Sequence, residues 1–187
     1  MSLKRIATII STGAVAVLVG GLASPAVSQA QDSLQFELTP SSAKLAECMP
    51  DASLVVTVKP NTDKKGSDNF VIQARNLPPN RTFTVFLLQQ ATSPFGAAEY
   101  IGDVSTNGQG DGRSAFNLIV GEAFSSTIVN GGRLRVDLNR IGVWFSDPAD
   151  DDFCFGNGGG SMTPFDGDGV AGVQAFNSAN ADPLPAP

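Results

Sequence analysis

The sequence predicts an all-β protein with about eight or nine short antiparallel strands that form a sandwich or a barrel, and of the two we expect a β-sandwich of immunoglobulin-like architecture. Short segments rich in β-branched and aromatic residues alternate apolar with polar positions. Turn residues separate these segments at intervals of roughly 8 to 15 residues. The intervals are too short for the crossover helices that parallel strands require.

The first expected strands lie in the amino-terminal half of this β-region. Residues 35–39 alternate apolar and polar side chains, and residues 53–59 are β-branched and end before Pro60. The strand at 69–75 ends before Pro78 and Pro79, because proline lacks a backbone donor and has a fixed φ. A further strand, 82–88, begins with strict alternation.

The second half contains a glycine-rich connection between two strands. Residues 106–112 include three glycines, Gly108, Gly110 and Gly112, which suit positive φ angles. This predicts a hairpin between strands at 100–105 and 113–120. Residues 121–126 suggest one short helical turn. The remaining expected strands are 133–137, 141–145 and 173–176.

The amino terminus has the three parts of an export signal. Lys4 and Arg5 precede an uncharged segment at 6–23, and Ser28 and Ala30 provide small side chains before a cleavage point. We expect cleavage after Ala30. The alternative is a permanent membrane anchor, since the uncharged segment approaches the roughly 20 residues that span a bilayer. Glycines within it and the lack of a following basic cluster favour cleavage.

Cleavage divides the chain into three predicted regions. These are a signal peptide at 1–30, one sandwich domain at 31–176 and a disordered, proline-rich tail at 177–187. The signal carries two of the twelve basic residues and none of the eighteen acidic ones, so removing it changes the net charge from −6 to −8. Because nucleic acids and anionic lipids repel this charge, we expect no nucleic acid partner and membrane contact only during export.

Cys48 and Cys154 are the only two cysteines, and both lie in the expected mature chain. In an oxidising compartment such a pair is most simply a disulfide. The alternative, a reactive or metal-binding thiol, lacks a nearby histidine or CxxC spacing. The pair therefore predicts a structural cross-link.

The sequence contains no histidine. This excludes Ser-His-Asp and Cys-His catalysis and the usual zinc and copper sites. Two carboxylates could still hydrolyse a glycoside, although no pair is identifiable from the sequence. The nucleotide-binding patterns GxxxxGK[ST] and GxGxxG are also missing.

Acidic turns near the carboxyl terminus suggest calcium as the one cofactor to consider. Turn carboxylates can converge on Ca²⁺. The candidate ligands are Asp150, Asp151, Asp152, Asp166 and Asp168. Residues 107–112 resemble the start of an EF-hand loop, but Leu118 stands where its glutamate belongs. The alternative is that aspartate and glycine simply build turns.

Trp144 is the only tryptophan and could stack a sugar as a binding platform. It lies between Val143 and Phe145 in an apolar segment, which favours a core position. The sequon at Asn80 to Thr82 is expected to be a turn entering a strand rather than a glycosylation site.

Two turn segments carry a family resemblance. The segment 77–85, Leu-Pro-Pro-Asn-Arg-Thr-Phe-Thr-Val, and the glycine-rich segment 101–110 resemble those of small secreted bacterial β-sandwich domains, which are largely uncharacterised. The likeness covers roughly residues 53–146. It implies the fold and an exterior location, and it implies no catalytic residue.

These observations predict a secreted, non-enzymatic protein at the cell exterior or cell envelope. Its expected role is binding or surface interaction, with a protein or a glycan as partner. One alternative is a calcium-dependent or carbohydrate-binding module that uses the acidic turns. The other is a histidine-free carboxylate hydrolase, which requires two acids facing each other across a cleft.

Overall fold

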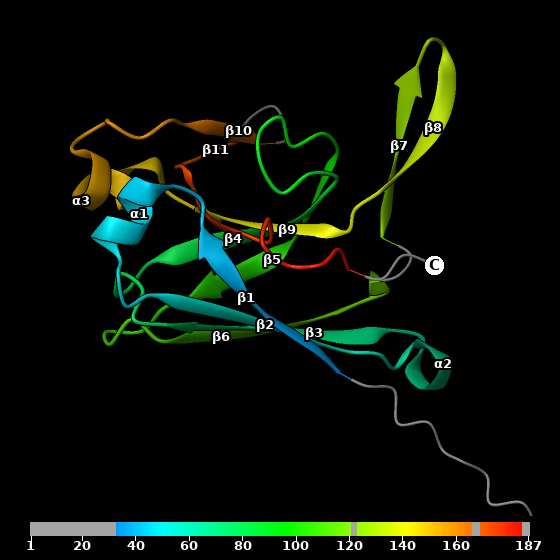
Figure 1. Ribbon diagram of the computed structural model, residues 1–187, viewed down its shortest axis with the longest axis horizontal. Helices are drawn as coiled ribbons and strands as arrows, with labels where there is room; N and C mark the ends of the chain where they lie inside the picture. The colour runs from blue at the N-terminus through cyan, green and yellow to red at the C-terminus, as the bar shows by residue number, and fades with distance from the viewer. Residues whose placement is uncertain (1–32, 121–122, 166–168, 185–187) are drawn as a thin grey trace, which may run out of the picture. The chain divides into compact units, whose positions relative to one another are not determined.

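The computed structural model describes residues 33–120, 123–165 and 169–184 (Figure 1). All of them belong to one unit, residues 31–187. The expected signal peptide lies outside the described residues. In the described part, no helix is long and apolar enough to cross a membrane.

Eight strands of the described chain form one antiparallel sheet in the order β5-β4-β9-β12-β1-β2-β3-β6. Their bounds are β1 Leu34–Pro40, β2 Ser53–Lys59, β3 Asp68–Arg75, β4 Thr82–Leu88, β5 Ala98–Ser105, β6 Gly112–Leu118, β9 Arg140–Phe145 and β12 Gln174–Asn177. The predicted all-β antiparallel fold is therefore confirmed.

Strand β1 belongs to both halves of this sheet. Its residues 34–38 pair with β2, whereas Thr39 and Pro40 pair with β12. The sheet consequently folds over on itself, with β2, β3 and β6 in one layer and β4, β5 and β9 in the other (Figure 1). The sandwich-like packing thus comes from one continuous sheet that is nearly closed into a barrel.

The core lies between the two layers. Alternation along β2 buries Leu54, Val56 and Val58 and leaves the residues between them partly exposed. On the opposite layer, Phe83 of β4 and Phe145 of β9 are fully buried, with ring centroids 5.0 Å apart. Period-two alternation therefore supplies the apolar surface that stabilises the fold.

A separate hairpin corrects one expectation. The helical turn predicted at 121–126 is wrong for the described residues, because β7 (Phe124–Val129) pairs with β8 (Gly132–Asp137). The turn is Asn130–Gly131, both at positive φ, a strong two-residue hairpin signal. Figure 1 shows this hairpin extending away from the eight-stranded sheet.

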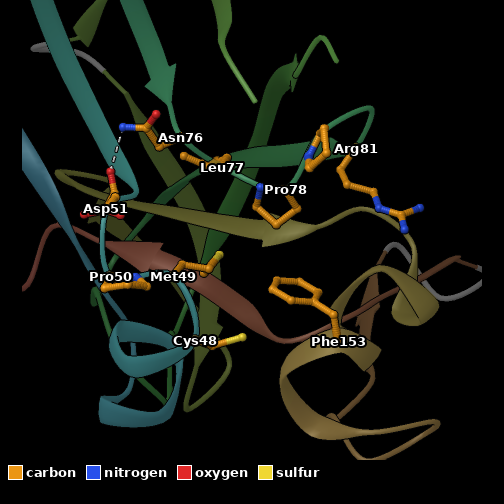
Figure 2. A pocket seen from close by; sticks show the side chains of 10 residues that line it. Cys48, Met49, Pro50, Asp51, Asn76, Leu77, Pro78, Arg81 and Phe153 are labelled. Carbon is orange, nitrogen blue, oxygen red and sulfur yellow. Dashed lines mark hydrogen bonds between the residues drawn. The ribbon is translucent and has the colours of Figure 1, made fainter. Parts of the chain in front are cut away.

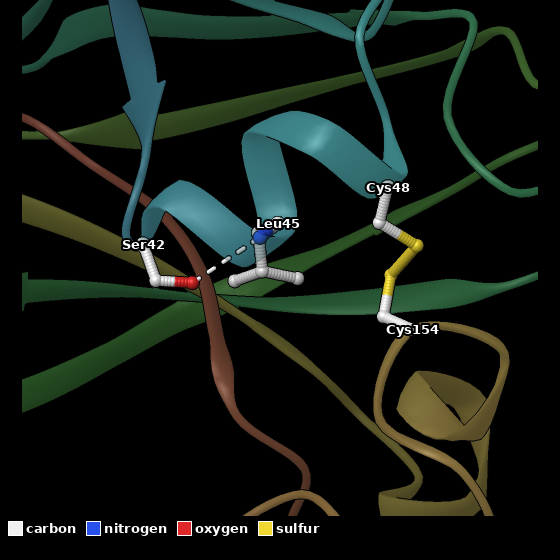
Figure 3. The surroundings of a disulfide bond; sticks show 4 residues. All are labelled: Ser42, Leu45, Cys48 and Cys154. Atoms are coloured by element: carbon white, nitrogen blue, oxygen red, sulfur yellow. Dashed lines mark hydrogen bonds between the residues drawn. A yellow bond between two sulfur atoms is a disulfide. The ribbon is translucent and has the colours of Figure 1, made fainter.

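Three short helices of the described chain gather at one end of the sandwich. Helix α1 (Ala43–Cys48) begins where the Ser42 hydroxyl accepts a hydrogen bond from the Leu45 amide. The 3₁₀ helix η2 (Pro148–Asp151) leads directly into α3 (Asp152–Phe155). The predicted Cys48–Cys154 disulfide is present and joins α1 to α3 (Figure 3). The other short elements are α2 (Thr62–Lys65), β10 (Thr163–Phe165) and β11 (Gly169–Ala171).

The carboxyl-terminal segment corrects a second expectation. Disorder was expected over 177–187, yet Ser178 and Leu184 are buried. The Leu184 amide donates to the Asn139 carbonyl, and the Arg140 guanidinium donates to the Ala181 carbonyl. Because these contacts satisfy backbone groups and bury an apolar side chain, the segment is ordered through Leu184. Residues 185–187 lie outside the described residues.

Candidate binding site

An open pocket of about 690 Å³ lies at the end of the domain that carries the disulfide (Figure 2). Its walls come from the turn after α1, the turn before β4 and helix α3. The lining residues are Cys48, Met49, Pro50, Asp51, Asn76, Leu77, Pro78, Pro79, Arg81 and Phe153. Segments far apart in the sequence therefore meet at this pocket.

The turn before β4 forms the first wall. Asn76 and Asn80 both have positive φ and flank the Leu-Pro-Pro segment between them. The Asn76 side-chain amide donates to the Asp51 carbonyl at 3.0 Å, which ties the turn to the segment after α1. Two prolines with fixed φ stiffen the stretch between the asparagines.

Thr106, a buried residue at the end of β5, holds this turn in place. Its hydroxyl lies 2.7 Å from the Pro78 carbonyl and accepts a hydrogen bond from the Arg81 amide at 3.0 Å. The Leu77 amide donates to the Gly110 carbonyl in the β5–β6 hairpin. A Cβ on Gly110 would lie 2.1 Å from the Leu77 carbonyl oxygen, so only glycine permits this approach.

Phe153 of α3 forms the opposite wall. Its ring points into the pocket toward Pro78 (Figure 2) and remains 52% exposed. It contacts Phe145 of the core edge to face, with centroids 6.1 Å apart. The neighbouring Cys154 anchors α3 to α1 through the disulfide. An exposed aromatic ring is thus held on a cross-linked support.

Arg81 adds charge at the rim of the pocket. Its guanidinium lies 2.8 Å from the Asp150 carboxylate, and the side chains are 46% and 14% exposed respectively. Burial raises the pKa of Asp150 above its ordinary value, and the attraction of the Arg81 guanidinium offsets only part of this rise. Because the Arg81 guanidinium is half-exposed, N–H donors that do not meet Asp150 face solvent beside the pocket.

The predicted calcium ligands have different partners. The Asp151 carboxylate is buried and accepts from the Val173 amide at 2.9 Å. Burial raises the pKa of Asp151. Asp152 accepts instead from the Gly158 amide. In the part of the chain that the structure describes, no three acidic or cysteine side chains form a set that could hold a metal.

Two of the calcium candidates cannot be placed. Asp166 and Asp168 lie outside the described residues. The structure places Asp150 and Asp151 in η2 and Asp152 at the start of α3, where the three carboxylates form no metal-binding set, and calcium binding stays a prediction.

Trp144 lies in a buried aromatic cluster outside the main core. It is 2% exposed and contacts Phe86 and Phe95 edge to face, with centroids 5.5 and 5.1 Å away. A sugar-stacking platform needs an exposed ring face, which this arrangement does not offer. The position matches the core alternative.

Two features of the sequence bear on the pocket. The Leu-Pro-Pro-Asn turn ends a predicted strand, and the Cys48–Cys154 disulfide joins the two helices that flank this turn in the fold. Phe153, which precedes Cys154, is the pocket residue that these two features indicate. Comparison with protein-family models, curated proteins and solved structures finds no match for this chain.

Proposed function

We propose that this chain is an exported, non-enzymatic binding protein that acts at the cell exterior through an immunoglobulin-like β-domain. The basic, apolar and small-residue segments at the amino terminus support export. The Cys48–Cys154 disulfide is compatible with an oxidising compartment. A partner protein meets the domain at the pocket between α1, α3 and the turn before β4.

The observation that carries this proposal is the exposed Phe153 ring held opposite a clamped Leu-Pro-Pro turn. Fully burying a phenylalanine side chain contributes about 1.5 to 3 kcal/mol, so covering its exposed half contributes roughly 1 kcal/mol. Aromatic and arginine side chains together dominate many protein interfaces. We infer that an extended peptide segment inserts an apolar side chain beside Phe153 and places an acceptor near Arg81.

The charged groups of the pocket favour binding over hydrolysis. Glycoside hydrolysis needs a pair of carboxylates across the substrate. Among the described residues, Asp51 is the only acidic one that lines the pocket, and Asp150 at its rim is paired with Arg81. The other side chains of the pocket wall are apolar or carry an amide group, which suits recognition of a peptide.

The test is selection of peptides from a random display library against the exported product of the full chain. Peptides that bind the wild type should bind Phe153→Ala about fivefold more weakly, because the aromatic contact worth roughly 1 kcal/mol is lost. Leu134→Ala is the matched control, since Leu134 is 53% exposed and lies on the separate β7–β8 hairpin. Equal binding to both variants would remove the pocket from the proposal.

A calcium-dependent module is the second candidate, and one observation favours it. The buried Oδ1 atom of Asp151 has no hydrogen-bond partner among the described residues. A cation using this oxygen together with Asp150 would have to displace Arg81. Saturating Ca²⁺ at about a hundred times its Kd would stabilise the fold by roughly 2.7 kcal/mol. A melting temperature that is equal in calcium and in chelator would exclude this candidate.

A further inference from the structure

The outer side of the sheet formed by β1, β2, β3 and β6 carries mostly polar side chains. Alternation directs these residues away from the core. We define the outer face by its side chains Gln35, Glu37, Ser53, Val55, Thr57, Lys59, Asn69, Val71, Gln73, Arg75, Arg113, Ala115 and Asn117. The strand register sets Gln73 between Val55 and Arg113 and sets Asn69 between Lys59 and Asn117.

This face differs in charge from the rest of the protein. It carries Lys59, Arg75 and Arg113, and Lys65 of α2 lines a hollow together with Lys59 at one end. These four are among the ten basic residues that remain after residues 1–30. Among the described residues, the acidic side chains on or beside the face are Glu37, Asp111 and the buried Asp68, which accepts from the Asn61 amide at the Lys59 end. The four basic side chains outnumber them, so the face is net positive on a chain whose mature charge is −8.

Three shallow hollows follow strand β3 along the outer face. One, of about 480 Å³, involves Arg75 and Gln73, and a second, of about 190 Å³, shares both residues. The third, of about 410 Å³, involves Lys59, Asn69 and Asn117 at the other end of the strand. The run from Asn69 to Arg75 is about 20 Å long at a strand rise of roughly 3.3 Å per residue. Basic groups therefore occur at both ends of an elongated polar surface.

We propose that the outer face binds an acidic polysaccharide lying along β3. Carboxylates spaced along such a polymer can pair with the separated basic side chains, because each meets a local positive potential. The amides of Gln73, Asn69 and Asn117 offer both donors and acceptors to sugar hydroxyls. This inference is independent of the pocket and adds a second surface to the proposed function.

The other anionic partners fit the face less well. Single-stranded nucleic acids are held largely by aromatic stacking, and the described side chains of the outer face include no aromatic ring. A membrane surface would favour apolar side chains inserting beside the basic ones. Between the basic ends lie amides together with Val55, Val71 and Ala115, and Val71 is buried, so no large apolar side chain projects from the described part of this face. The polysaccharide is therefore the occupant that matches both the charge and the polar groups.

The experiment measures binding of the exported product to polygalacturonate, with neutral dextran as the uncharged control. We expect binding to polygalacturonate alone, weakening as NaCl rises because the contact is charge-based. Arg75→Gln/Arg113→Gln should weaken it about tenfold and reduce the salt dependence. Lys44→Gln/Arg135→Gln removes the same charge outside the face and should leave binding unchanged.

Several outcomes would overturn the inference. These are no binding to polygalacturonate, equal loss in the control pair, or equally tight binding to single-stranded DNA or phosphatidylserine vesicles. Phe153→Ala separates the two proposals, because Phe153 lines the pocket and lies on no part of the outer face. The Phe153→Ala variant should bind the selected peptides more weakly and should bind polygalacturonate as tightly as the wild type does.

Discussion

Replacing Gly110 with alanine tests whether the turn before β4 is clamped as the structure indicates. Gly110 has a φ of +81°, and an added Cβ would lie 2.1 Å from the backbone carbonyl oxygen of Leu77. Gly66 is a matched control: its φ is +75°, and nothing lies within 4 Å of the position of its Cβ. Both substitutions therefore introduce the same backbone strain, and only Gly110→Ala also introduces a collision.

The difference between the variants follows from these contacts. A left-handed conformation costs an alanine roughly 1 to 2 kcal/mol, which sets the expected loss for Gly66→Ala. In Gly110→Ala the Leu77 segment must also move by over an ångström to reach ordinary contact distance. That movement breaks one or two of the hydrogen bonds that Gly110 and Thr106 make with the turn, at about 1 kcal/mol each. We expect a total loss of about 3 kcal/mol.

Urea denaturation of both variants measures these free energies of unfolding. For a domain of roughly 150 residues, 1 kcal/mol corresponds to about 2 to 4 °C in melting temperature, so Gly110→Ala should melt about 6 to 12 °C lower than the wild type. It should also weaken binding of the selected peptides, because Leu77 and Pro78 line the pocket. Equal destabilisation by the two substitutions would refute the close approach of Gly110 to Leu77.

The remaining predictions concern the cross-link, export and the buried acid. The double substitution Cys48→Ser/Cys154→Ser opens a loop with a sequence separation of 106 residues, and urea denaturation should show a loss of about 4.7 kcal/mol, matched by reducing the wild type. Amino-terminal sequencing of the exported product should begin at Gln31, and an intact amino terminus would contradict the export signal. Burial raises the pKa of Asp151, so protonation of this carboxyl group stabilises the folded state. This contribution to the free energy of unfolding is fully present below pH 3.8, the ordinary pKa of the group, and is lost as the pH rises through the raised pKa of the folded state. Asp151→Asn should remove this fall in stability, and an unchanged pH profile would contradict the burial of that carboxylate.

The strands were predictable because their pattern is local. Alternation in residues 53–59 directs Leu54, Val56 and Val58 to one side, and that side is the core. Strand β7 was missed although Asn130–Gly131 is a strong hairpin signal, because a helical turn was expected over 121–126, which overlaps its first residues. The order of residues 178–184 was missed because Leu184 is buried by contacts far away in the sequence.

The candidate site depends on contacts that no local pattern reveals. The disulfide was predicted from cysteine number and compartment, but the two helices that it joins, α1 and α3, were not predicted. The pocket also requires that Thr106 hold the turn of Pro78 and that Asp150 meet Arg81. These pairs are separated by many residues, so their meeting follows from sheet topology. Trp144 illustrates the converse, since its apolar neighbours already indicated burial.

The most direct test of the binding proposal is hydrogen–deuterium exchange of the exported protein with and without a peptide selected on it. Ordering of the pocket by a ligand should slow exchange at residues 48–51, 76–81 and 150–155, where the lining segments lie. The outer face and the β7–β8 hairpin should exchange as before. Slower exchange confined to those two regions, with no change around Phe153, would contradict the assignment of the pocket as the binding site.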